Sequence, residues 1–352
     1  MPSQIAHLVF AVEAISGGLA DLNLPIDSPW LGLGAQGPDI FYHNRRRRPS
    51  ALGYGALLHR RGYGTAVAAM AESAREQSVP LESSLGAFIL AFATHAVLDR
   101  EFHPFINYRA GWGPSVPAAP TDPPFQLHPW FERALDVIIL DRWWNSSPQT
   151  FDVLARLDCG PDLPAPIARA YCRALHAVSP ASRTDPHMAQ RMRNAYHDAI
   201  GFYEACNLVN LERYEEVLHS DEPVGRRARW ISLLHPPLLP AGLDLANDDH
   251  RPWYNPCDVD NPSHDSMEDL WGKAMGQARS VVREIAAAWR DGVSISEATA
   301  AITHAVGDTN LSDGRTIGRP CRKRNRALLP LDRWLLAVLE QRRADPDVHW
   351  SR

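Results

Sequence analysis

The sequence predicts an all-α protein, a single multi-helix bundle domain with long loops. Three observations support this class. Apolar residues recur at three- and four-residue steps in every long segment, the pattern of amphipathic helices. No segment alternates long enough to indicate a strand. Most of the 29 prolines fall in connections such as "GWGPSVPAAPTDPPFQLHP", where they cannot interrupt a helix.

The periodic segments predict about nine helices in chain order. These lie at residues 6–16, 63–76, 85–102, 129–144, 165–178, 188–208, 267–292, 294–306 and 329–343. The last belongs to a C-terminal extension, residues 311–352, that carries an amphipathic helix. The helical domain proper is expected to span residues 1–310.

Composition bounds the function. The 352 residues are 45% hydrophobic and 22% charged, as in ordinary globular proteins. The formal charge of −5 gives no general attraction to polyanions, so no stable nucleic-acid partner is expected. Two local basic runs, Arg45 to Arg48 and residues 318–326, are interpreted as solvated loops or as patches for a phosphate or an anionic lipid surface.

Targeting signals and cysteine usage favour the cytoplasm. The N-terminal stretch lacks a basic region and contains Glu13, so it does not resemble a signal peptide, and no apolar run is long enough to cross a membrane. The five cysteines are odd in number and free of any CxxC pair. They are interpreted as buried thiols of a reducing compartment.

One glycine motif is a decoy. "GLGAQG" (Gly32, Gly34, Gly37) fits the dinucleotide-binding pattern, which requires a strand before it and a helix after it. Pro38 and Asp39 follow instead, and no βαβ unit surrounds the motif. The glycines are therefore expected to turn the backbone tightly and to aim Asp39 inward.

The stretch "THAVLDREFHP" contains the most informative spacing. Residues four apart lie on one helix face about 6 Å apart along the axis, so His95 and Asp99 can share one cation and Asp99 and His103 a second. His95 and His103, about 12 Å apart, are too distant to bind the same ion. Asp99 is thus the expected bridging carboxylate. Pro104 predicts that the helix ends at His103 and leaves that imidazole free to swing.

A second pair, His128 and Glu132, has the same spacing at the start of a helix. Imidazole and carboxylate together suit zinc in a hydrolytic site. Six of the 15 histidines lie in the first 132 residues, several in apolar surroundings. Core packing would explain each alone, but their concentration with Asp39, Asp99 and Glu132 favours a polynuclear metal site.

The ordered motifs resemble the bacterial zinc-dependent phospholipase C family, which shares its helical fold and three-zinc site with the S1/P1 nucleases. The resemblance covers roughly residues 1–140 through "SQIAHLVF", "GAQGPDIFYH", "LLHRRG", "FATHAVLDREFHPFI" and "HPWFE". "WYNP" and "SMEDLW" resemble the closing segments of the family with less specificity.

The resemblance implies a ligand set within residues 1–132 for two or three Zn²⁺ ions. His59, His95 and Asp99 would hold one ion, with Asp39 as a further ligand or the general base. His103, His128 and Glu132 would hold a second. His7 and Asp99 would hold a third, which the N-terminal residue of the mature chain completes in the family.

The expected activity is hydrolysis of a phosphodiester by metal-activated water, as in phospholipase C, with Phe41 and Tyr42 contacting the substrate. A phospholipid substrate would bring a transient contact with a membrane surface. The alternatives are a nuclease of the S1/P1 type, which cuts single strands, and a metal-stabilised helical binding protein without hydrolytic activity.

Overall fold

The structure is a computed structural model that describes residues 3–112, 123–206, 212–290, 292–321 and 326–344. Over these residues the chain is all-helical, which confirms the predicted class; it contains no β-strand there, only an isolated bridge between Trp253 and Ser263. The α-helices are α1 (Gln4–Gly18), α2 (Pro29–Ala35), α3 (Ile40–His43), α4 (Leu52–Leu58), α5 (Tyr63–Glu76), α6 (Ser84–Ala110), α7 (Leu127–Trp144), α8 (Ala165–Val178), α9 (Met188–Cys206), α10 (Glu212–His219), α11 (Val224–Ile231), α12 (Met267–Ala288), α13 (Ile295–Val306) and α14 (Leu331–Ala344).

The described residues thus form fourteen helices rather than the nine expected. The five additional ones, α2, α3, α4, α10 and α11, have only four to eight residues each. Segments of one or two turns are too short to display a 3.6-residue period, so their apolar pattern does not distinguish them from loops. Tertiary packing, not local periodicity, stabilises such short helices.

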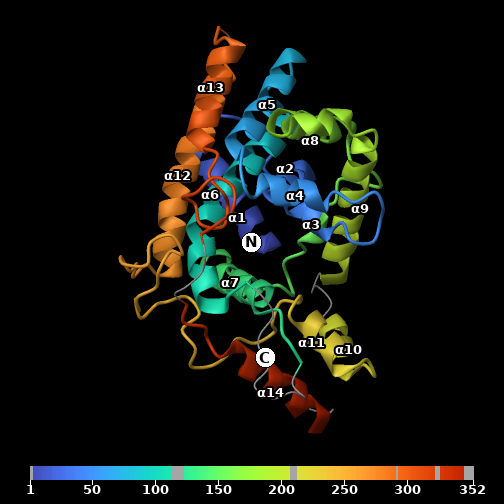
Figure 1. Ribbon diagram of the computed structural model, residues 1–352, viewed down its shortest axis with the longest axis vertical. Helices are drawn as coiled ribbons and strands as arrows, with labels where there is room; N and C mark the ends of the chain where they lie inside the picture. The colour runs from blue at the N-terminus through green and yellow to red at the C-terminus, as the bar shows by residue number, and fades with distance from the viewer. Residues whose placement is uncertain (1–2, 113–122, 207–211, 291, 322–325, 345–352) are drawn as a thin grey trace.

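Helix α6 is the central element (Figure 1) and is buried on nearly every face. The Ser83 side chain accepts a hydrogen bond from the Gly86 N–H and begins the helix, and Gly111, with a φ of 72°, ends it. Helices α1, α2, α5, α7 and α12 all contact α6. A helix surrounded in this way can bury polar side chains where its neighbours supply partners.

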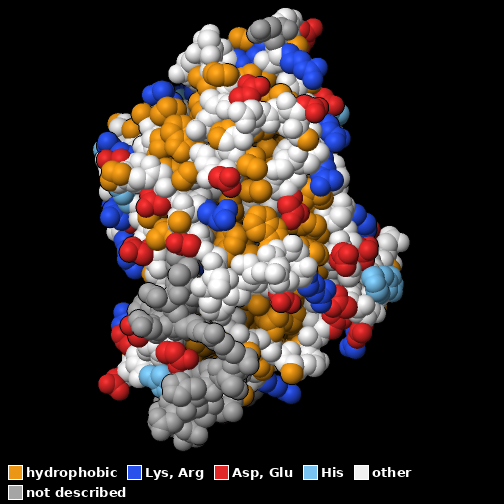
Figure 2. Space-filling model, turned by 180° about the vertical axis from the view of Figure 1, so that it is seen from behind, with side chains coloured by type: hydrophobic (Ala, Val, Ile, Leu, Met, Phe, Trp, Pro, Cys, Tyr) orange, Lys and Arg blue, Asp and Glu red, His pale blue; other side chains and the backbone are white. Residues whose placement is uncertain are grey.

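Helices α12 and α13 stand on one side of α6, α8 and α9 stand on the other, and α14 lies with α10 and α11 at one end (Figure 1). On the face seen in Figure 2, acidic and basic side chains are interspersed among hydrophobic ones, so no single-sign patch dominates that face. None of the described helices combines the length and apolar character that a transmembrane span requires.

The predicted helix end at His103 is wrong. Helix α6 continues through Pro104 to Ala110. A proline removes one main-chain hydrogen bond and strains the preceding turn. Here the turn beyond it is held by packing, since Phe105 and Ile106 are fully buried. The His103 ring is therefore fixed in the core and not free to swing.

The start of α1 is tied to α7. Ser3, the N-cap residue, makes no side-chain cap, and the first helical N–H groups turn instead to a buried carboxylate. Asp136 accepts hydrogen bonds from Ala6 N at 2.8 Å and from Ile5 N at 3.4 Å, and it also contacts Nε2 of His235 at 2.8 Å. A carboxylate near the helix N-terminus also complements the helix dipole. Helix α1 is thereby fixed in register with α7.

The C-terminal extension lies against the bundle. Leu329 N donates to Arg109 O at 2.8 Å, and the Trp334 ring lies 5.2 Å from the ring of Trp130. The expectation of five free thiols is wrong at two positions, because Cys257 and Cys321 form a disulfide across 64 residues. Distant cysteines carry no pairing signal in the sequence. Cys159, Cys172 and Cys206 are thiols outside this disulfide.

Candidate metal centre

Three groups of buried histidines and carboxylates lie together inside the bundle. Their ligand atoms lie within 4.8 Å of one another in each group. The groups are His7, His95 and Asp99; Asp39, His59 and His95; and His103, His128 and Glu132. All eight residues predicted as ligands therefore occur in these groups, brought together from α1, the turn before α3, the end of α4, α6 and α7.

Asp99 lies at the middle of the centre and is fully buried. Its Oδ1 lies 3.3 Å from Nε2 of His7, and its Oδ2 lies 3.3 Å from Nε2 of His95. Oδ2 is also 3.9 Å from Nε2 of His59. The two carboxylate oxygens thus face different histidines, as the geometry of a bridging ligand requires.

The second group is built around Asp39. Its Oδ1 lies 2.9 Å from Nε2 of His59 and 3.8 Å from Nε2 of His95. Gly37 positions this turn: its φ is 55°, and a Cβ there would lie 2.5 Å from Cγ of His95. Glycine is the residue that permits both the conformation and the close approach. This agrees with the expected turn at Gly37. Gly32 and Gly34 do not turn the backbone: they lie in α2, where a Cβ would clash with Arg156 O and Phe88 O.

The third group lies toward α7. Oε1 of Glu132 lies 2.8 Å from Nε2 of His128 and 3.9 Å from Nε2 of His103. The i, i+4 spacing predicted a cation between Asp99 and His103, yet it is Nδ1 of His103 that lies near Asp99, at 3.8 Å. That nitrogen hydrogen-bonds a main-chain carbonyl, so His103 contributes its Nε2 to the Glu132 group.

Four of the histidines share one arrangement of their hydrogen bonds. In each, Nδ1 faces a main-chain carbonyl, which can only accept, so Nδ1 carries the proton. Such a hydrogen bond fixes the tautomer and directs Nε2 toward a ligand position. The pairs are His59 with Gly55 O, His95 with Ala35 O, His103 with Leu311 O and His128 with Gly111 O.

The ligand atoms themselves fit a set of divalent cations. Nε2 of His7, His95 and His103 and both oxygens of Asp99 are buried without a hydrogen-bond partner. Each such orphan costs about 1–3 kcal/mol. A neutral imidazole that donates through Nδ1 also points its Nε2 lone pair at carboxylate oxygens, which is repulsive unless positive charge lies between them. Imidazole nitrogen with carboxylate oxygen is a donor set that suits zinc and other divalent transition metals.

The electrostatics of the first two groups favour positive charge between the ligands. Burial would raise the pKa of Asp99, but His103 and His95 outweigh it and hold that pKa well below its usual value. The pKa of Asp39 is lowered against its burial by His95 and His59. Burial would lower the pKa of His95, but Asp99 and Asp39 raise it. Both carboxylates are thus anionic at neutral pH.

The third group is less charged by itself. Burial lowers the pKa of His103 to about 3 and raises the pKa of Glu132 well above its usual value. A neutral imidazole keeps its lone pair for a metal. A cation bound here would displace the proton of Glu132.

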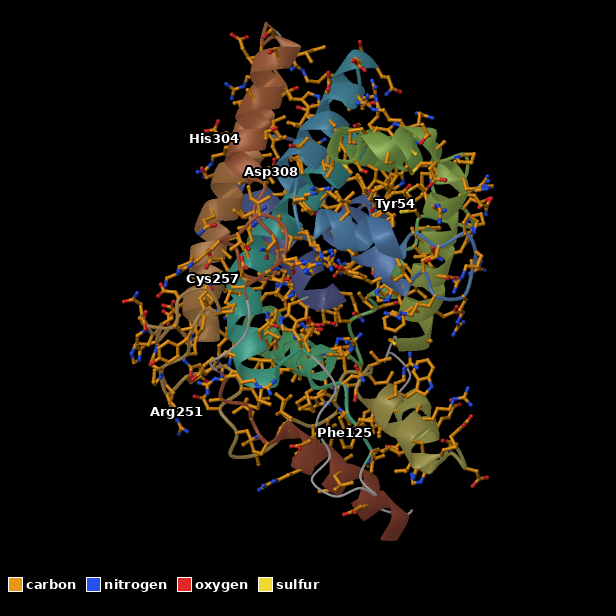
Figure 3. The ribbon with its side chains drawn as sticks, viewed as in Figure 1. Tyr54, Phe125, Arg251, Cys257, His304 and Asp308 are labelled. Atoms are coloured by element: carbon orange, nitrogen blue, oxygen red, sulfur yellow. A yellow bond between two sulfur atoms is a disulfide. The ribbon has the colours of Figure 1, made fainter. Side chains whose placement is uncertain are left out.

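A segment far along the chain supports the centre, and sequence reasoning missed it. Leu311 N donates to His59 O at 2.8 Å, and Leu311 O accepts the hydrogen bond of His103. Residues 308–321 are held by Thr65, whose hydroxyl donates to Asp308, and by the disulfide at Cys321. Asp308 and Cys257 lie on the side of α12 and α13 (Figure 3). No local motif announces such support.

The centre opens on a cleft of about 460 Å³. Asp39 and Glu132 reach its wall. Tyr42 lines it as well and lies 4.7 Å from the ring of His59, whereas Phe41 is fully buried and packs edge-on against Tyr171. Of the two residues predicted to contact the substrate, Tyr42 thus lies on the wall of the cleft, and Phe41 lies in the core.

Two other features are not part of the centre. Cys257, Asp313 and Cys321 lie close enough to hold an ion, but the two sulfurs are bonded to each other and are not thiolate ligands. A larger cleft of about 990 Å³ lies between Gly18 and Trp289, and its described lining contains no histidine.

Comparisons with family models, curated proteins and solved structures find no match for the chain. The fold and the site together define an all-helical protein with three buried histidine and carboxylate groups that could hold metal ions. The expected N-terminal ligand, residues 1–2, lies outside the described residues.

Proposed function

We propose that the protein is a zinc-dependent phosphodiesterase that resembles phospholipase C and cleaves a phospholipid headgroup ester. The observation that carries the proposal is the convergence of three ligand groups, of which two carboxylates, Asp39 and Glu132, reach the wall of an open cleft. A metal that only stabilised the fold would need no access from solvent, since structural sites are closed.

The first two groups would hold two cations through Asp39, His59, His95, Asp99 and His7. Bound divalent cations neutralise phosphate oxygens and make hydroxide available near neutral pH. Asp39 belongs to a ligand group and also faces the cleft, and its lowered pKa keeps it ionised. It either completes a coordination shell or accepts the proton of the attacking water.

The third group would lie beside the leaving alcohol. His103, His128 and Glu132 would hold the cation that stabilises the departing alkoxide. Glu132 lines the cleft, so the scissile phosphate can lie between it and Asp39. The chain would thereby position both the entering and the leaving oxygen for in-line displacement.

Aromatic side chains in the cleft favour a second candidate, a nuclease of the S1/P1 type. Tyr42, Phe202 and Tyr203 line the cleft, and the Phe202 ring stacks on His43 at 4.1 Å. Flat rings of this kind can also stack on nucleobases.

Metal analysis of protein purified without added zinc tests the shared premise, and at least two tightly bound zinc ions per chain are expected. Assays on phosphatidylcholine, a bis-aryl phosphodiester and single-stranded DNA then separate the candidates. Asp99→Ala and His95→Ala should abolish both zinc retention and hydrolysis. His304→Ala, on the exposed surface of α13 (Figure 3), is the matched control. Less than one zinc per chain, or full activity in Asp99→Ala, would overturn the proposal.

A further inference from the structure

We propose that the cleft selects phosphodiesters whose headgroup carries a second negative charge, such as a phosphomonoester, and binds that group with Arg45, Arg133 and Arg229. This inference rests on the proposed hydrolytic function and names its substrate class. The three arginines come from separate segments: the loop after α3, helix α7 and helix α11. All three line the cleft that Asp39 and Glu132 also line.

The charges of the cleft wall do not balance. Among its described residues the carboxylates are Asp39 and Glu132, and both belong to metal-ligand groups. The remaining fixed charges are the three guanidinium groups. Bound cations would add further positive charge, so the cleft would attract a polyanionic ligand and repel a cationic headgroup.

Among the described residues, the three cleft arginines form no ion pairs of the kind that nearby arginines form. Arg47 pairs with Asp198 at 2.7 Å, and Arg226, on the same helix as Arg229, pairs with Glu222 at 2.9 Å. In the part of the chain that the structure describes, no ion pair within 4.0 Å involves Arg45, Arg133 or Arg229. Their charges are therefore available to a ligand.

Arg133 is the most constrained of the three and is 5% exposed. Its Nη1 donates to Pro129 O at 2.8 Å, and its guanidinium carbon lies 5.9 Å from the centre of the Phe202 ring. Its Nε is buried without a hydrogen-bond partner. Because the Arg133 side chain also lines the cleft, one residue after Glu132, its charge favours an anionic oxygen bound there.

The Arg45 side chain is positioned by its Nε, which donates to Tyr42 O at 3.1 Å. Arg229 is exposed and lines the cleft. A guanidinium group presents a planar fork of donors that matches phosphate oxygens. The scissile diester phosphate would be held by the cations, so the arginines would remain for a second phosphate. A cleft of about 460 Å³ is the size of one headgroup rather than of an extended polymer. The geometry therefore favours a phosphorylated lipid headgroup.

The test compares three short-chain lipids with the zinc-loaded protein: dioctanoyl phosphatidylcholine, phosphatidylinositol and phosphatidylinositol 4-phosphate. The last two differ only by one phosphomonoester, and we expect kcat/KM to be about tenfold higher for the phosphorylated lipid, mainly through KM. Arg229→Gln and Arg45→Gln should each remove most of this preference. Arg226→Gln, on the same helix but outside the cleft lining, should keep it.

A binding measurement separates failure of this inference from failure of the proposed function. Inositol 1,4-bisphosphate should bind the zinc-loaded protein calorimetrically, and Arg229→Gln should weaken that binding about tenfold whether or not any lipid is hydrolysed. Hydrolysis with equal efficiency on all three lipids, or a preference for phosphatidylcholine, would overturn the inference. An arginine-dependent preference confined to 5′-phosphorylated dinucleotides would replace the lipid by a nucleotide.

Discussion

Gly37 lies directly against the ring of His95, so that a Cβ on Gly37 would come within 2.5 Å of the imidazole. Gly37 also has a φ of 55°. This contact joins the turn that carries Asp39 to the helix that carries Asp99. The backbone of Gly37 thus sets the distance between two ligand groups.

Gly37→Ala should therefore disturb the metal centre more than the rest of the fold. A side chain in the left-handed region costs about 1–2 kcal/mol, and the clash with His95 adds to it. We expect fewer retained zinc ions and a lower midpoint of thermal unfolding. Gly53→Ala is the matched control, because a Cβ on Gly53, in α4, meets nothing within 4 Å. Equal zinc content in the two variants would contradict this account of Gly37.

Breaking the disulfide should weaken the third ligand group. Cys321 ends the segment whose Leu311 carbonyl fixes His103. Loss of an outer hydrogen bond to a ligand typically lowers metal affinity about 10- to 100-fold. We expect the Cys321→Ser variant, or the reduced protein, to lose zinc at a lower chelator concentration than the parent protein does. Cys172→Ser, which removes a free thiol, should behave as the parent protein does.

Removal of the Asp136 carboxylate should destabilise the whole chain. Asp136 is fully buried and accepts hydrogen bonds from the start of α1 while it contacts His235. Removal of this acceptor leaves buried donors, the Ala6 N–H among them, without a partner, and each such loss costs about 1–3 kcal/mol. Asp136→Ala should lower the free energy of unfolding by about 3 kcal/mol in urea titrations. Asp136→Asn retains an oxygen that can accept from Ala6 N and should lose less stability. An unchanged urea midpoint in both variants would refute the role of Asp136 in fixing α1.

The contact of Asp198 with the loop of residues 44–47 should make the stability of the fold decrease at acid pH. Burial opposes ionisation of Asp198, but hydrogen bonds from Arg47 and Asn44 outweigh it and lower its pKa below the ordinary 3.8. A carboxyl whose pKa is lower in the folded state contributes stability above the unfolded value, and this contribution is lost as the pH falls through the folded value. The difference in unfolding midpoint between the parent and Asp198→Asn should therefore shrink from pH 5 to pH 3. A difference in midpoint that stays constant over this pH range would contradict the stabilising role of the ionised Asp198.

The sequence allowed the long helices and the ligand residues to be predicted, because both depend on local spacing. Apolar periodicity marks α6, and the i, i+4 steps mark His95, Asp99 and Glu132. Local rules failed at Pro104, where packing of the following turn overrides the conformational preference before proline.

The long-range support of the site was not predictable. Leu311 is 208 residues from His103, and Cys257 is 64 residues from its partner. Neither contact leaves a repeating pattern in a single chain. Likewise, the burial that shifts the pKa of Glu132 depends on the assembled bundle.

Leu311 touches two ligand groups at once, since its N–H donates to the His59 carbonyl and its own carbonyl accepts from the His103 ring. A cation bound at the His59 group or at the His103 group would restrict the motion of Leu311. The second cation would then bind with a smaller loss of conformational entropy. Zinc uptake is therefore expected to be cooperative, with a sigmoidal binding curve in which the first ion favours the next.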